Sequence, residues 1–266
     1  MPLITVNNTE INYRFDGPAE GPVVLFSNSL ATNLTMWDRQ IAALTAAGYR
    51  VLRYDTRGHG QSAVPEGPYS IEMMSGDVVG LMDVLDLPRV HFCGLSLGGM
   101  VGQMMGATHA DRLHSLTLCS TASFVALKET WDERIAAARK DGMEGAVDAT
   151  VDRWLTTAGQ ERLPGEVEKI RHMVRTTSVE GYCACGVAIQ RMDLREKIRG
   201  ITTPTLVLVG EHDPSTPVAA AEFIHGRIAS SELRVIADAA HLINVEQDDV
   251  FNEALLGFLN KNRERE

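Results

Sequence analysis

The chain has 266 residues, of which 44% are hydrophobic and 23% are charged, and its formal net charge at pH 7 is −10. A chain of this size buries a sizeable core without a disulfide or a metal, and it has room for one α/β core with an inserted segment. The negative charge argues against nucleic acid as a partner, because proteins that bind nucleic acids present basic surfaces.

Short apolar runs alternate with helical patterns along most of the chain. Residues 3–15 alternate in polarity around an Asn-Asn turn, which predicts an antiparallel hairpin. Six apolar runs predict buried strands, and helices are expected between them, so we predict a mostly parallel sheet covered by helices on both faces. The predicted strands are residues 23–26, 51–54, 90–93, 116–119, 205–209 and 233–236, and the predicted helices are 36–47, 71–85 and 98–109.

The alternation stops between residues 121 and 199. This segment is rich in Ala, Glu, Arg and Lys, with helical spacing at residues 129–140, 143–155 and 166–176 and no strand pattern. We therefore predict an α/β core formed by residues 1–120 and 200–266, and a helical cap formed by residues 121–199. A helical insertion after one strand is well placed to cover the strand ends where ligands bind.

The four cysteines do not form a disulfide framework. Cys93 and Cys119 lie in strand-like runs, and Cys183 and Cys185 are too close for a C-x2-C metal site. We expect buried free thiols in a reducing compartment and no bound metal. The glycine-rich turn at residues 55–62 matches neither a P-loop nor a dinucleotide fingerprint, so it is interpreted as a structural turn and no cofactor is predicted.

The N-terminal residues have neither the basic start nor the apolar core of a signal peptide. No apolar run approaches the ~18 residues that a membrane-spanning helix needs. We therefore expect a cytoplasmic protein without a membrane segment.

The most informative motif is Gly94-Leu95-Ser96-Leu97-Gly98, a G-x-S-x-G pattern between an apolar strand and a helical segment. The turn in such a motif is so tight that the serine adopts a strained backbone conformation, and only glycine fits at the flanking positions. The serine hydroxyl then projects from the edge of the sheet. Ser96 is therefore the predicted nucleophile.

An acid and a base follow the next predicted strands. Asp213 comes after the strand at 205–209, and His241 comes after the strand at 233–236. The chain order Ser, Asp, His is that of the α/β-hydrolase fold. We predict that His241 is the base and that Asp213 orients it.

Other residues compete for these two roles. Glu211 lies beside Asp213 and is an alternative acid, and Asp238 lies close to His241 in the sequence, although its place before the turn favours capping. His59, in a turn, and His91, within a strand, are alternative bases.

An oxyanion hole needs two backbone amides, one after the nucleophile and one from the loop after the first core strand. These positions are Leu97 and Leu30. Two N–H groups aimed at a developing oxyanion typically lower the barrier by several kcal/mol.

The D-x-R-G-x-G-x-S turn at residues 55–62, the G-x-S-x-G motif, the late G-x-x-D and the A-x-H together resemble the α/β-hydrolase superfamily over essentially the whole chain. More narrowly, the chain resembles the 3-oxoadipate enol-lactonases. This second resemblance rests on Ser27-Asn28-Ser29-Leu30, Met36-Trp37-Asp38, Trp131, Arg134 and residues 181–195. Most of the superfamily has His-Gly where this chain has Asn28-Ser29.

The resemblance implies hydrolysis of an enol-lactone to 3-oxoadipate in the catabolism of aromatic compounds. The substrate is then a small anionic lactone, which an acidic protein must hold with a local cation. Arg134 is the candidate cation, although a solvated face of a cap helix explains it equally well, and Trp131 and Trp154 are candidates for the apolar wall.

Several alternatives stay open. The same triad serves other esterases, carbon–carbon hydrolases and perhydrolases, and a non-catalytic binding protein can keep the fold. A haloalkane dehalogenase is excluded, because it would need an aspartate in place of Ser96. The sequence is also compatible with a homo-oligomer.

Overall fold

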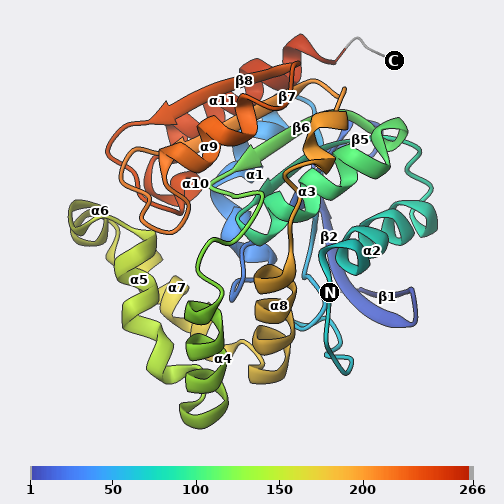
Figure 1. Cartoon of the computed structure of the whole chain (residues 1–266). Coiled ribbons are helices and arrows are strands. Elements are labelled where there is room, and N and C mark those ends of the chain that lie inside the picture. Colours follow the sequence, from blue (N-terminus) through green and yellow to red (C-terminus); the bar gives the residue numbers. More distant parts are fainter. Residues whose placement is uncertain (1, 264–266) are drawn as a thin grey trace.

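A computed structural model of the chain describes residues 2–263, and its centre is a twisted eight-stranded sheet in the order β1-β2-β4-β3-β5-β6-β7-β8 (Figure 1). β1 and β2 form the predicted antiparallel hairpin, and β2 pairs antiparallel with β4. The other neighbours are parallel, as predicted. The strands are β1 (Leu3–Val6), β2 (Thr9–Asp16), β3 (Val23–Ser27), β4 (Arg50–Tyr54), β5 (Val90–Leu95), β6 (Leu113–Cys119), β7 (Thr205–Gly210) and β8 (Ser231–Ile236).

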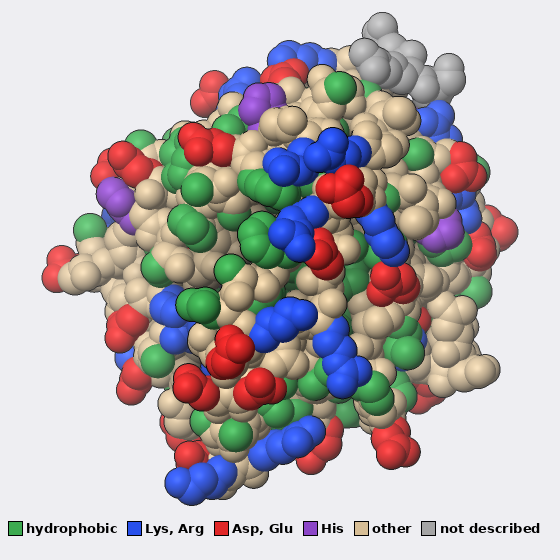
Figure 2. Space-filling view, in the orientation of Figure 1, with side chains coloured by type: hydrophobic (Ala, Val, Ile, Leu, Met, Phe, Trp, Pro, Cys, Tyr) green, Lys and Arg blue, Asp and Glu red, His purple; other side chains and the backbone are tan. Residues whose placement is uncertain are grey.

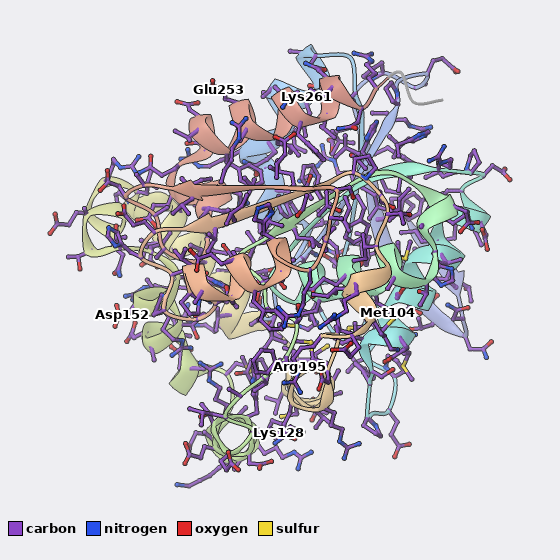
Figure 3. The ribbon with its side chains drawn as sticks, turned by 45° about the horizontal axis from the view of Figure 1, so that its top comes forward. Met104, Lys128, Asp152, Arg195, Glu253 and Lys261 are labelled. Carbon is purple, nitrogen blue, oxygen red and sulfur yellow. The ribbon has the colours of Figure 1, made fainter. Side chains whose placement is uncertain are left out.

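Helices cover both faces of the sheet. α2, α3 and α9 pack on one face, and α1 and α11 pack on the other. In Figure 3, Glu253 and Lys261 mark α11 on one side of the strands, and Met104 marks α3 on the opposite side. The helices of this core are α1 (Asp38–Ala46), α2 (Ile71–Val84), α3 (Leu97–Thr108), α9 (Val218–His225), α10 (Ile243–Glu246) and α11 (Asp248–Lys261). Short 3-10 helices are η1 (Leu34–Trp37) and η2 (Ala110–Arg112).

The segment between β6 and β7 is helical and lies beyond the C-terminal ends of the parallel strands, and we call it the cap (Figure 1). Its two ends are joined by an antiparallel bridge between Phe124 and Asp193 and by the hydrogen bond from Leu194 N–H to Ser123 O, 2.7 Å. The division of the chain into two domains remains a prediction. The cap helices are α4 (Glu129–Asp141), η3 (Glu144–Ala146), α5 (Val147–Trp154), α6 (Thr157–Arg162), α7 (Pro164–Thr176) and α8 (Val179–Arg191), and η4 (Lys197–Gly200) follows them.

Helix α8 has no counterpart among the helices predicted from the sequence. Its run Gly181-Tyr182-Cys183-Ala184-Cys185-Gly186 has no polar face, and all six residues are buried. A helix buried on most sides shows no amphipathic period. α8 packs against α4, and at Gly181 it touches the backbone of the turn at residues 55–62.

The turn at residues 55–62 joins the core to the cap. Gly58 has φ +79°, and a Cβ there would collide with the backbone of Gly181 in α8. The buried Arg57 guanidinium pairs with the Asp77 carboxylate of α2, which holds the turn to the core. The structural interpretation of this turn therefore agrees with its contacts.

The four cysteines are free and buried, as expected. Cys93 Sγ and Cys119 Sγ are neighbours on adjacent strands, 3.9 Å apart. Among residues 2–263, no helix is both long and apolar enough to cross a membrane. On the face shown in Figure 2, basic and acidic side chains are interspersed.

The register of the parallel strands brings their C-terminal ends to one rim. Ser27 pairs with Gly94, Leu95 pairs with Cys119, and Gly210 pairs with Ile236. The loops that follow β3, β5, β7 and β8 therefore emerge side by side, beneath the cap. These loops carry every core residue predicted for the site.

Candidate active site

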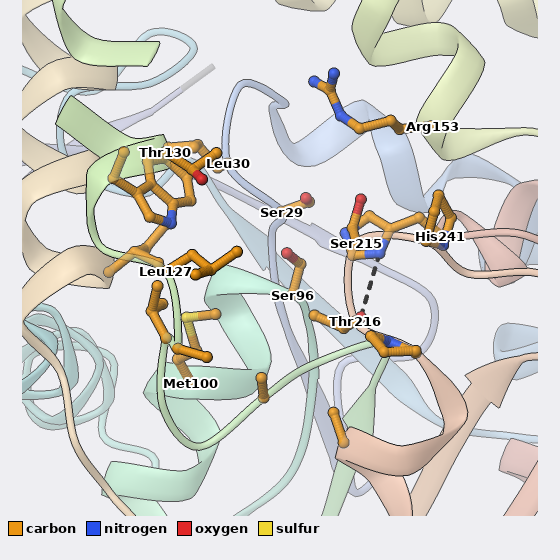
Figure 4. A pocket seen from close by; sticks show the side chains of 18 of the residues that line it. Ser29, Leu30, Ser96, Met100, Leu127, Thr130, Arg153, Ser215, Thr216 and His241 are labelled. Carbon is orange, nitrogen blue, oxygen red and sulfur yellow. Dashed lines mark hydrogen bonds between the residues drawn. The ribbon is translucent and has the colours of Figure 1, made fainter. Parts of the chain in front are cut away.

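A cavity of about 670 Å³ lies between this rim and the cap (Figure 4). Ser96 and His241 line it from the core, and Arg153 enters from α5 of the cap. The three predicted substrate-binding residues Trp131, Arg134 and Trp154 also line it. Its volume suits a small organic substrate.

Ser96 stands between the end of β5 and the start of α3, with φ +57° and ψ −112°. This is the strained conformation that the motif predicts, since a residue other than glycine rarely adopts positive φ. A Cβ at position 94 would overlap the Gly98 carbonyl, and a Cβ at position 98 would overlap the Ser27 carbonyl. The turn is held by the hydrogen bond from Ser96 N–H to Cys119 O, 2.9 Å.

His241 and Asp213 are brought together by the loops after β8 and β7. The Asp213 Oδ2 atom lies 2.8 Å from His241 Nδ1, and both side chains are buried. Burial opposes ionisation of Asp213, but the attraction of His241 and the hydrogen bonds from His241 and Thr216 lower its pKa below the usual value. Asp213 is therefore an anion suited to orienting an imidazole. Ser96 and His241 share the cavity without a hydrogen bond between their side chains among the described residues.

Thr216 belongs to this cluster and was not predicted. Its hydroxyl donates to Asp213 Oδ2 at 2.7 Å and lies 3.4 Å from His241 Nδ1. Asp213 Oδ1 accepts the backbone N–H groups of Ser215 and Thr216, 2.8 and 3.0 Å away. An aspartate often accepts the backbone N–H two residues later, so Asp213 followed by proline was a local signal for this turn, whereas the bond from the Thr216 hydroxyl had no such signal.

The alternative acids lie elsewhere. Glu211 is half exposed on the surface, where its Oε2 atom is 3.8 Å from His212 Nε2 and accepts the Asp238 N–H at 3.4 Å. Glu211, His212 and Asp238 form an exposed cluster that does not line the cavity. Among the three candidate acids Glu211, Asp213 and Asp238, Asp213 is the one that contacts His241.

The alternative bases are buried and hydrogen-bonded away from the cavity. His59 Nε2 accepts the Ala31 N–H at 3.0 Å, and His91 Nδ1 lies 2.8 Å from Ser115 Oγ. Burial lowers the pKa of each imidazole to about 4, and for His91 the neighbouring His114 adds to the effect. Both histidines therefore support the fold as neutral rings.

These two histidines predict how stability depends on pH. The unfolded chain takes up protons on them below about pH 6.5, whereas the folded protein does so only near pH 4, so folding opposes protonation. We expect the contribution of these neutral histidines to the free energy of unfolding to be fully present above pH 6.5. It should be lost as the pH decreases towards 4, by up to about 3 kcal/mol per histidine. Urea unfolding at several pH values measures this. His91→Gln should flatten the slope, and an unchanged slope would contradict the assignment.

The backbone N–H groups around the cavity differ in whether they have a protein acceptor. The Gly98 N–H donates to Asn28 O at 2.9 Å, and the Ala31 N–H donates to His59. In residues 2–263, neither Leu30 N–H nor Leu97 N–H has a protein acceptor, and Leu97 is the first residue of α3, where helical N–H groups lack a partner. These are the two positions predicted for the oxyanion hole.

Asn28 explains the departure from His-Gly in this loop. Its Nδ2 donates to Tyr54 O at 2.7 Å, and its Oδ1 accepts the Trp37 indole N–H at 2.9 Å. Both partners are buried, so the amide fixes the loop that carries Leu30.

Two arginines are the only charged residues along the cavity wall within the described chain, apart from the titratable His241. Arg134 lies over the Trp131 ring, with its guanidinium carbon 5.0 Å from the ring centroid. Arg153, which was not predicted, hydrogen-bonds Thr150 Oγ1 at 3.1 Å, and its pKa is lowered by burial and by nearby Arg134. A protein of net charge −10 thus presents two neighbouring cations and no carboxylate to this cavity.

Trp154 lies directly after Arg153 and faces the imidazole. Its ring is 6.2 Å from the His241 ring between centroids, with 29° between the ring planes. The segment 153–154 therefore contributes one cation and one apolar surface to the site. Trp154 was predicted from the sequence, whereas the adjacent Arg153 was not.

Comparison with known proteins agrees with this geometry. The profile of the alpha/beta hydrolase fold family matches residues 22–248. The chain is 38% identical to 3-oxoadipate enol-lactonase 2 of Acinetobacter baylyi, over 95% of this chain and 94% of that protein. The enol-lactonase from Burkholderia xenovorans LB400 superposes with a TM-score of 0.95 at 43% identity, over 97% of this chain and all of the other. A thermophilic esterase from Thermogutta terrifontis superposes with a TM-score of 0.91 at 29% identity, over 98% of each chain. The chain therefore belongs to the alpha/beta hydrolase fold family and is a hydrolase.

Proposed function

We propose that the protein is a serine hydrolase that opens the lactone ring of 3-oxoadipate enol-lactone and yields 3-oxoadipate in the catabolism of aromatic compounds. The observation that carries the proposal is the cavity itself. It combines Ser96 and His241 with two arginines and no carboxylate among the residues described. Identities of 38% and 43% to enol-lactonases support the choice of substrate.

The proposed acylation step uses the residues of the rim. His241 takes the proton of the Ser96 hydroxyl, and Oγ attacks the lactone carbonyl. The oxyanion that forms is held by the N–H groups of Leu30 and Leu97. The ring C–O bond then breaks, and the leaving enolate oxygen receives the proton from His241. Asp213 stabilises the imidazolium in the meantime.

Deacylation completes the turnover. The enol relaxes to the ketone, so the ring opening leaves an acyl-enzyme with a 3-oxo group. His241 removes a proton from a water molecule, and the hydroxide formed attacks the acyl carbonyl. His241 then returns the proton to Ser96 Oγ as the bond between Oγ and the acyl carbon breaks. The product carries two carboxylates, one from the substrate and one newly formed.

The assay that tests this proposal compares the enol-lactone with nitrophenyl esters of short acids. We expect kcat/KM for the lactone to exceed that for every neutral ester. An esterase is the second candidate, favoured by the similarity to the Thermogutta esterase. Equal or better turnover of neutral esters would support it instead, and a missing burst of nitrophenol would point to a binding protein.

The arginine pair provides a sharper prediction. Arg134→Ala and Arg153→Ala should each weaken kcat/KM for the anionic lactone by roughly 2–4 kcal/mol, the cost of removing one partner of a buried charge pair. Lysine should substitute poorly, because a guanidinium binds a carboxylate through two parallel hydrogen bonds. Neutral esters of similar size should lose little.

Arg139→Ala is the matched control, since Arg139 lies on α4 like Arg134 but is exposed and does not line the cavity. Measuring kcat/KM for both substrate types on the four proteins decides the outcome. An equal loss on lactone and ester would mean that the arginines only support the cap.

A further inference from the structure

Glu246, the last residue of α10, is a fully buried carboxylate five residues after His241. Within residues 2–263 it forms no ion pair, and its oxygens accept from two separate parts of the chain. Oε2 accepts the Ala240 N–H at 2.8 Å. Oε1 accepts the Thr156 N–H at 2.9 Å and, in a very short contact, the Thr156 hydroxyl.

These contacts join the loop of His241 to the cap. Ala240 precedes His241, and its N–H reaches Thr156 through Glu246. Leu242 follows His241, and its N–H donates directly to Trp154 O at 3.0 Å. Both residues that flank His241 in the chain are therefore tied, through their N–H groups, to residues 154–156, which directly follow Arg153.

We propose that Glu246 is a positioning residue that holds His241 in line with the substrate-binding segment of the cap. The inference rests on the proposed function in so far as His241 is the catalytic base. A carboxylate suits the place because it offers acceptors in two directions, where a neutral amide offers one acceptor and one donor. Loss of that carboxylate leaves buried donors without an acceptor, and the loop shifts to satisfy them.

A small shift of a catalytic group lowers the reaction rate strongly. A displacement of about 1 Å can lower the rate about 100-fold while leaving binding contacts in place. Glu246 touches neither the cavity nor Ser96, so its loss should act on the chemical step through His241. This separates it from Arg134 and Arg153, whose loss should act on recognition of the anionic substrate.

The test is Glu246→Gln, measured by kcat and KM on an activated nitrophenyl ester and by the rate at which a fluorophosphonate labels Ser96. Both readouts depend on the nucleophile and its base and are independent of the natural substrate. We expect kcat and the labelling rate to fall about 10- to 100-fold, with KM changed less than about threefold.

Thr156→Val is the second variant, because it keeps Glu246 and removes the hydroxyl donor on the cap side. It should lower kcat by a smaller factor in wild type, because the Thr156 N–H still donates to Glu246, and by a still smaller factor in Glu246→Gln, because both changes weaken the same bridge. If the loss of kcat in the double variant equalled the product of the losses in the two single variants, the proposed bridge would be contradicted.

Met82→Ala controls for lost stability, since Met82 is fully buried on α2 and does not line the cavity. If Glu246→Gln loses no more labelling rate than Met82→Ala at equal thermal stability, or loses only in KM, the inference is wrong. If wild type itself is not labelled at Ser96, the proposed function fails instead.

Discussion

Ser96→Ala should abolish turnover while leaving the fold intact. Removing the serine from a comparable triad lowers kcat on the order of a million-fold, because the covalent route disappears and only binding and the oxyanion hole remain. The strained turn itself depends on Gly94 and Gly98 rather than on the hydroxyl. The melting temperature should therefore stay within a few degrees of wild type, or rise.

Three measurements check this result. Steady-state turnover of the enol-lactone gives the loss in kcat, and thermal unfolding shows that the variant is folded. A fluorophosphonate should label wild type at Ser96 and leave the variant unmodified. A folded Ser96→Ala protein that retained a tenth of native activity would end the triad assignment.

Asp213→Asn should lower kcat about 10,000-fold, the second largest effect. With its oxygen held by the N–H groups of Ser215 and Thr216, the amide presents its NH2 group to His241 Nδ1. The imidazole then adopts the wrong tautomer for accepting the Ser96 proton. The substitution also removes the anion that stabilises the imidazolium. Because the pKa of Asp213 is below its usual value, the carboxylate additionally stabilises the folded state at neutral pH, and this contribution is lost as the pH falls through the folded pKa.

Glu211→Gln is the matched control, since Glu211 lies two residues earlier and is half exposed. Its kcat should stay within about twofold of wild type, as for most surface substitutions. The comparison needs kcat for both variants at one pH and substrate concentration well above KM. If the two losses came out reversed, the orienting acid would be Glu211.

The fold class followed from local patterns, because each predicted strand is a short apolar run bounded by turn residues and helical patterns separate most of these runs. The order of Ser96, Asp213 and His241 along the chain likewise identified the fold before any contact was known. The strained backbone at Ser96 was predictable too, since it depends on glycines only two residues away. These features are encoded over distances of a few residues.

Other features were decided by contacts between distant segments. The sequence predicted Asp213 as the orienting acid and left Glu211 as an alternative, and the placement of the β8 loop beside the β7 loop puts Asp213 next to His241. α8 was missed because its burial against both α4 and the turn at residues 55–62 removes the amphipathic period.

The roles of Arg153 and Glu246 likewise depend on tertiary contacts that the local sequence does not indicate. An arginine on a cap helix has the same local pattern whether it faces solvent or a cavity, and Arg134 was a candidate only through the resemblance to the enol-lactonases. A glutamate in a C-terminal helix gives no sign that it is buried between Ala240 and Thr156, more than 80 residues apart in the chain. The sequence by itself thus determined the fold and the chemistry of each loop, because these depend on neighbouring residues. Tertiary packing decided which charges face the cavity and what holds the base in place, because desolvation and hydrogen bonding depend on what folds against each group.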